Sequence, residues 1–189
     1  MKIAYKFLRT GLKSKYDGSP WKLGEWRKVN SPCEPCVGLN ASRNIVDALS
    51  YVQGEILAKV EYKGGVIDSG DKLTCEKMRI VRTWKWTKEH SVRLAVYAAR
   101  QVLSIYEEEY PGDDRPRRAI EAAEAYLKDP SNKTARAAVH ATAAAAGAVY
   151  AARSAVHAAD AAALAANAGT KNKIHKYILR MLLKEENLQ

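Results

Sequence analysis

The pattern of hydrophobic and polar positions changes near Thr87. Residues 54–62 and 73–86 alternate between apolar and polar side chains, as β-strands do when successive residues point to opposite faces. Lys63-Gly64-Gly65 lies between apolar runs and predicts a hairpin turn. In the second stretch, the even-numbered positions Met78, Ile80, Trp84 and Trp86 form an apolar face that Arg82 interrupts. The odd-numbered positions form a face with a basic stripe.

After Thr87 the apolar residues recur every three or four positions, which predicts helices. Pro111-Gly112 ends the first of them, and Asp114 with Pro116 begins the next. Residues 135–168 contain 20 alanines in 34 positions, and Gly169 is expected as a C-cap. The last predicted helix has one apolar face, formed by Ile174, Tyr177, Ile178, Met181 and Leu182.

Together these patterns predict an α+β fold. Residues 1–86 form a small β-rich N-terminal part, and residues 87–189 form an Ala-rich antiparallel helical array. Within the first part, glycines and prolines interrupt residues 1–40, and a short helix is expected over 43–52 with Ser42 as its N-cap.

The net charge of +10 is concentrated at the N-terminus, where residues 1–30 hold eight Lys or Arg against two acids. Aromatic side chains are interleaved with these cations, an arrangement that stacks bases while it neutralises phosphates. The same pattern also describes a strand with apolar residues inside and lysines outside. The candidate binding residues are Lys6, Arg9, Lys13, Lys15, Lys22, Arg27 and Lys28, together with the stripe Lys77, Arg79 and Lys85.

The chain offers few candidates for chemistry. Its three cysteines, Cys33, Cys36 and Cys75, form no disulfide framework, so we expect free thiols in a reducing cytoplasm. A zinc site would need all three together with His90, and we expect neither a metal nor a cofactor. No stretch is apolar enough for a signal peptide or a membrane span.

One polar stripe on the Ala-rich stretch allows two interpretations. Arg153, His157 and Asp160 recur at helical spacing, and a His–Asp pair can serve in acid–base catalysis. Without a nucleophile or a recognised catalytic motif, we favour a structural seam that fixes the register between helices. We therefore expect a protein that is not an enzyme.

Residues 93–103 and 110–123 resemble the immunity-protein family linked to bacterial polymorphic toxins, most specifically in the segment D-x-R-P-R-x-A-I-E-A. The resemblance covers about residues 90–183. It implies a protein that binds and neutralises another protein, such as a toxin or a host defence effector, whose surface would be acidic or would bind nucleic acid.

The N-terminal part is similar to an uncharacterised domain of phages and prophages. The matching residues are Gly38-Leu39-Asn40-Ala41-Ser42, Asp47-Ala48-Leu49-Ser50-Tyr51, Gly54-Glu55-Ile56-Leu57 and Asp71-Lys72-Leu73. Such domains usually have His where this chain has Asn40. A phage origin would place the protein in the host cytoplasm and would make neutralisation a counter-defence, with anti-CRISPR action as one form. The alternative function is nucleic-acid binding by the basic, aromatic-rich N-terminal part.

Overall fold

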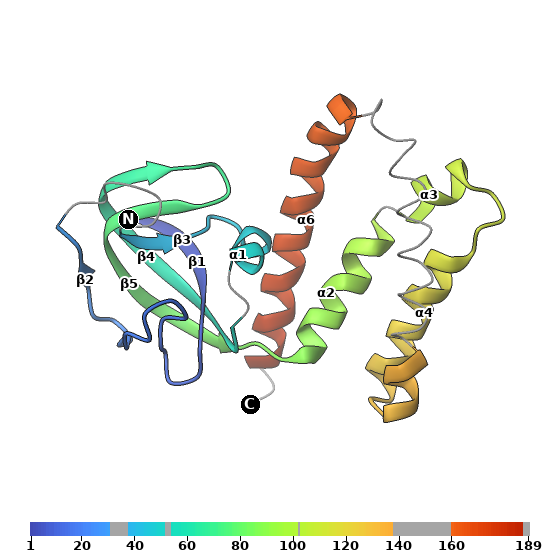
Figure 1. Ribbon diagram of the computed structural model, residues 1–189, viewed down its shortest axis with the longest axis horizontal. Coiled ribbons are helices and arrows are strands. Elements are labelled where there is room, and N and C mark those ends of the chain that lie inside the picture. Colours follow the sequence, from blue (N-terminus) through green and yellow to red (C-terminus); the bar gives the residue numbers. More distant parts are fainter. Residues whose placement is uncertain (31–37, 52–53, 102, 138–159, 187–189) are drawn as a thin grey trace. The chain divides into compact units, whose positions relative to one another are not determined.

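The computed structural model describes residues 1–30, 38–51, 54–101, 103–137 and 160–186 (Figure 1). It confirms the α+β fold, with an antiparallel sheet and helices. Two compact units divide the chain: Met1–Thr87 together with His175–Gln189, and Lys88–Ile174. The first break coincides with the change of pattern at Thr87. Unlike the predicted division, the C-terminal end of the chain is grouped with the sheet.

The sheet belongs to the first unit and is built from β1 (Lys2–Leu8), β2 (Arg27–Lys28), β3 (Leu39–Ala41), β4 (Ile56–Asp68) and β5 (Leu73–Lys85). Antiparallel pairing joins β1 to β4 and β4 to β5, and both short strands pair with the other side of β5. Just after β3, Ser42 exchanges two backbone hydrogen bonds with Tyr5 of β1, at 2.7 and 2.8 Å. The strand path therefore returns to β1, and the sheet closes on itself.

The closed sheet surrounds the main core, and we call the face that carries this core the inner face. Because side chains alternate along a strand, β1 contributes Ala4, Lys6 and Leu8 to the inner face and Tyr5 and Phe7 to the outer one. The buried core residues are Ala4, Leu8, Trp21, Leu39, Ala41, Ala58, Val60, Tyr62, Leu73, Cys75, Met78 and Ile80.

The predicted hairpin turn at Lys63-Gly64-Gly65 is wrong. Strand β4 continues through these residues with a bulge before Val66, where Gly64 has a φ of 88°. A Cβ atom at Gly64 would lie 2.5 Å from Oε2 of Glu76, so glycine suits both the backbone and the close approach. The chain turns instead at residues 69–72, where the amide of Ser69 donates to the carbonyl of Lys72 at 2.8 Å.

Helix α1 (Ile45–Tyr51) begins two residues later than predicted. The backbone of Ser42 is hydrogen-bonded to Tyr5 of β1. The Oδ1 of Asn44 instead accepts a hydrogen bond from the amide of Val46 at 3.0 Å. An Asn side chain at a helix start satisfies an amide that has no partner within the helix.

Helix α6 (Asp160–Glu186) runs through Gly169, so the predicted C-cap at that glycine is wrong. A single interior glycine costs only about 1 kcal/mol, which the burial of apolar side chains farther along offsets. Ile178 and Leu182 are almost completely buried, as the predicted apolar face requires. His175 lies against the sheet unit, because its Nδ1 accepts the amide of Ile45 at 3.3 Å.

The second unit contains α2 (Lys88–Arg100), α3 (Leu103–Glu109) and α4 (Arg115–Lys128). The apolar stripe predicted as one helix is interrupted at Gln101, whereas the stop at Pro111-Gly112 is confirmed. Pro116 lies in the first turn of α4, also as predicted. None of the helices in the described part of the chain is long and apolar enough to cross a membrane.

Most of the Ala-rich stretch, residues 138–159, lies outside the described residues. The polar seam predicted for Arg153 and His157 lies there too, and Asp160 is the first residue of α6. The packing of this stretch and the role of its polar residues stay predictions.

Candidate anion-binding site

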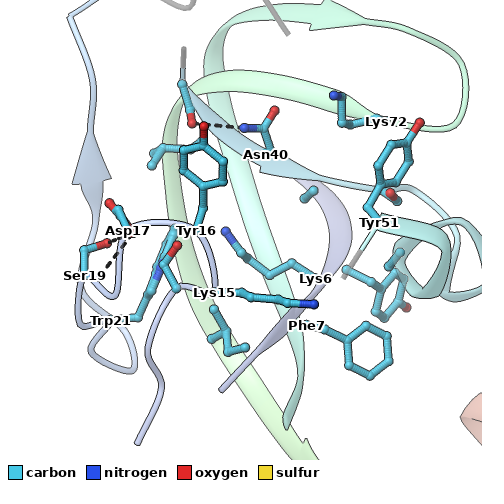
Figure 2. Close-up of a pocket in the computed structure, with 18 of the residues that line it drawn as sticks. Lys6, Phe7, Lys15, Tyr16, Asp17, Ser19, Trp21, Asn40, Tyr51 and Lys72 are labelled. Atoms are coloured by element: carbon cyan, nitrogen blue, oxygen red, sulfur yellow. Dashed lines mark hydrogen bonds between the residues drawn. The ribbon is translucent and has the colours of Figure 1, made fainter. Parts of the chain in front are cut away.

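A cavity of about 560 Å³ opens within the sheet unit, and four cationic side chains from four segments line it (Figure 2). Lys6 comes from β1, Lys15 from the loop that follows, Arg27 from β2 and Lys72 from the turn between β4 and β5. Asp17 is the one carboxylate among the described lining residues. The cavity wall is therefore strongly positive.

Lys6 is the most unusual member of this group, because it lies on the inner face between the fully buried Ala4 and Leu8. Its Nζ lies 4.2 Å from the centroid of the Trp21 ring. Within the described residues the ammonium has no hydrogen-bond acceptor and no ion pair. Burial, and secondarily the charge of Arg27, lowers the pKa of Lys6 from 10.5 to about 8.

Arg27 approaches the same ring, with its Cζ 4.6 Å from the centroid. Its Nη1 donates to the hydroxyl of Ser19 at 2.9 Å, and that hydroxyl donates to Asp17 at 2.8 Å. Hydrogen bonds from Ser14 and Ser19 lower the pKa of Asp17 to about 2, so its carboxylate is ionised at neutral pH. Asp17 thus makes hydrogen-bonded contact with Arg27 only through an intervening hydroxyl, and its charge acts on Lys6 through space, as the smallest of the effects on the pKa of that lysine.

The opposite side of the cavity carries polar and aromatic groups that contacts with neighbouring residues hold in place. Figure 2 shows Lys6 between Asp17, Ser19 and Trp21 on one side and Tyr51 and Lys72 on the other. The hydroxyl of Tyr51 donates to Asp71 at 2.6 Å, and the Nζ of Lys72 lies 5.1 Å from the Tyr51 ring.

Asn40 also lines the cavity and is held from two sides. Its Oδ1 accepts from Thr74 at 2.7 Å, and its Nδ2 donates to the carbonyl of Gly38 at 3.3 Å. These contacts fix the amide at the cavity wall.

Three of the predicted binding residues line this cavity, namely Lys6, Lys15 and Arg27. Two others, Arg9 and Lys13, form a backbone bridge beside a smaller hollow that also contains Glu55.

The remaining candidates lie apart from the cavity. Lys22 is paired with Glu25 at 3.4 Å. Lys28 is opposite Lys77 across β2 and β5, and Lys85 is exposed at the end of β5.

Arg79 is engaged in an ion pair, with 2.6 Å between its Nη2 and the Oε2 of Glu61. Its Cζ also lies 4.8 Å from the centroid of the Trp26 ring, and the Nζ of Lys63 lies 4.3 Å from the same centroid. We call these four residues the Trp26 cluster. Its carboxylate balances one of its two cations.

Sequence patterns missed Lys72, Asn40 and Tyr51 as cavity residues. Lys72 lies just before the strand predicted from Leu73 and belongs to no predicted element, and the turn between β4 and β5 at residues 69–72 was not expected. No local signal marks these positions, because each reaches the cavity through a separate tertiary contact.

In the part of the chain that the structure describes, no group of three or more His, Cys, Asp or Glu lies close enough to hold a metal ion. Cys33 and Cys36 lie outside the described residues. Cys75 is fully buried on the inner face, where burial raises its thiol pKa to about 11. His90 is buried in α2.

In the segment that carries the immunity-family resemblance, the charged side chains contact residues of their own unit. Asp113 accepts hydrogen bonds from Tyr106 and Arg115 at 2.7 Å. Arg117 binds Glu107 with two hydrogen bonds, at 2.8 and 2.7 Å. These side chains therefore join α3 to the start of α4, and the contacts give them a structural role within their own unit.

Comparisons of the chain with protein-family models, with curated proteins and with solved structures found no match. The resemblances to the immunity family and to the phage-type domain therefore stay predictions.

Proposed function

We propose that this chain is a binding protein for single-stranded nucleic acid and that the sheet unit holds the strand at its basic cavity. The observation that carries the proposal is the convergence of Lys6, Lys15, Arg27 and Lys72 on one cavity that contains a single described carboxylate. Cations that track a phosphate backbone, next to aromatic rings, are typical of single-strand binding. The proposal concerns binding without catalysis.

A single strand fits this site better than a duplex. The cavity has a volume within the range of about 300–1,000 Å³ found for small-ligand sites, so it admits individual nucleotides. Bases in a duplex are stacked and paired, whereas those of a single strand can enter a pocket. Tyr51, with 46% of its surface exposed, offers an aromatic ring at the cavity wall.

Fluorescence anisotropy with a labelled oligonucleotide tests the proposal. Binding is expected to weaken linearly with the logarithm of salt concentration, with a slope of about −0.7 for each phosphate contacted on a single strand. Lys15→Gln and Lys72→Gln are each expected to reduce that slope by about 0.7. Lys63→Gln is the matched control, since it removes an exposed lysine of the Trp26 cluster, outside the cavity. Absence of binding at 50 mM salt would contradict the proposal.

Neutralisation of a protein target is the second candidate. A basic cavity and its surroundings also complement an acidic protein surface. An acidic protein that mimics nucleic acid would bind to the same cations. An affinity pull-down from the native host tests this function. Recovery of no specific protein at physiological salt would count against it.

A further inference from the structure

We infer that Lys6 and Arg27 together bind a terminal phosphate group, a phosphomonoester, in the cavity. The inference rests on the proposed function and names the chemical group that the cavity selects. The source of that group is the phosphorylated end of a strand or a free nucleotide. In both, the phosphate would lie against the two cations held by Trp21.

The first support is that two cations are held against one fixed ring. The Nζ of Lys6 and the Cζ of Arg27 lie 4.2 and 4.6 Å from the centroid of Trp21, which is only 4% exposed. The indole gives each cation a modest attraction but carries no net charge. Two like charges on one ring repel each other, and an anion that contacts both cations would offset that repulsion.

The Trp26 cluster shows the same arrangement with its anion in place. There Lys63 and Arg79 lie 4.3 and 4.8 Å from the Trp26 centroid, and Glu61 contacts Arg79 at 2.6 Å. At Trp21 the corresponding acceptor is missing from the described residues, because Asp17 reaches Arg27 only through Ser19. An anionic ligand would supply this acceptor.

The charge and position of the pair favour a phosphomonoester over an internal phosphodiester. A monoester carries about −1.5 to −2 charges at pH 7 and three terminal oxygens, which match two cations that both donate. Lys6 extends into the cavity from the inner face of β1, between Ala4 and Leu8, which are fully buried, so its surroundings are enclosed on the strand side. A chain end reaches such a place, whereas an internal phosphate would need both flanking nucleotides to leave again.

Protonation of Lys6 is consistent with this role. Its pKa is lowered to about 8, so the ammonium is still mostly charged at neutral pH. A bound dianion would raise that pKa, and binding is therefore expected to weaken as the pH rises from 7 to 9.

The test compares oligonucleotides of one sequence that end in a 5′-phosphate, a 3′-phosphate or hydroxyl groups only, by anisotropy with the intact wild-type chain. We expect one phosphorylated form to bind at least ~10-fold more tightly than the hydroxyl form, as charge-assisted contacts to two cations allow. Equal binding of all three forms would overturn the inference and leave the proposed function standing. Failure of every form to bind would overturn both.

Substitutions of Lys6 and Arg27 then test whether this pair causes the preference for a phosphorylated end. Lys6→Met and Arg27→Gln are each expected to reduce the phosphate preference to less than ~3-fold, and Lys63→Met is expected to keep it. Undiminished preference in both cavity variants, with folding verified by tryptophan fluorescence, would contradict the assignment.

Competition with adenosine monophosphate, with adenosine as its control, distinguishes the two sources of the phosphate. If micromolar concentrations of adenosine monophosphate displace the strand, the site is assigned to free nucleotides. Displacement only at far higher concentration assigns it to strand ends.

Discussion

Replacing Lys6 with methionine should stabilise the sheet unit while it removes the proposed phosphate contact. The lysine is half-buried on the inner face, without an anionic partner in the described residues. A pKa that falls from 10.5 to about 8 corresponds to roughly 3 kcal/mol of destabilisation of the charged form in the folded state. Methionine keeps the apolar stem and loses the contact with Trp21, which is worth about 1–2 kcal/mol. We therefore expect a net gain of about 1–2 kcal/mol at pH 7.

The pH dependence of the free energy of unfolding separates this cause from a change in packing. Because the folded pKa of Lys6 is lowered, the ammonium penalises the fold fully at pH values below 8. The penalty decreases between pH 8 and 10.5 and is absent above 10.5. Between pH 7 and 9.5 the wild type should therefore gain roughly 2 kcal/mol relative to Lys6→Met.

Urea unfolding followed by tryptophan fluorescence measures this difference, because all four tryptophans lie in residues 21–86 of the sheet unit. Lys63→Met is the control, since it removes an exposed lysine that also stacks on a tryptophan. It should show neither the gain at pH 7 nor the change with pH. A variant Lys6→Met that is less stable than the wild type at pH 7, or a difference that does not vary with pH, would refute the reasoning.

Three further predictions concern the same unit. Gly64→Ala should lower the free energy of unfolding by about 1–2 kcal/mol, measured by the same urea titration, because the residue has a positive φ and its Cβ would meet Glu76. Burial lowers the pKa of His175, so the folded state favours the neutral ring; stability from this group is present above pH 6.5 and is lost as the pH falls through the folded pKa. The hydrogen-exchange protection of residues 175–186, expressed relative to the intrinsic exchange rate at each pH, should accordingly decrease on acidification from pH 7 to 5, and His175→Gln, whose side chain can still accept the amide of Ile45, should remove that response. Cys75, buried and with its pKa raised to about 11, should resist a thiol reagent until urea unfolds the protein, in a variant whose other two cysteines are serine; rapid labelling of the folded protein would show that the core opens.

The sequence alone determined the class of each half of the molecule. Alternation over residues 54–62 and 73–86 predicts strands, and the helical period after Thr87 predicts helices, because both depend on neighbours within a few positions. For the same reason Pro111-Gly112 marks a helix end correctly, and the apolar face around Ile178 is buried as its spacing requires.

Local patterns failed where distant segments change what a residue does. Gly64 and Gly65 have the composition of a turn, but pairing with β5 makes them a bulge beside Glu76. Gly169 has the composition of a helix end, but α6 continues to a stretch whose apolar side chains are buried.

The candidate site was decided by tertiary structure. Composition identified an N-terminal region rich in cations and aromatic residues, and three of its lysines and arginines line the cavity. Which three they are depends on strand register, because a shift of one residue would move Lys6 from the inner face to the outer one. Lys72 joins them only because the β4–β5 turn lies at residues 69–72. A cavity whose cations come from positions 6, 15, 27 and 72 exists only after the sheet has closed, and no pattern within a few residues records that closure.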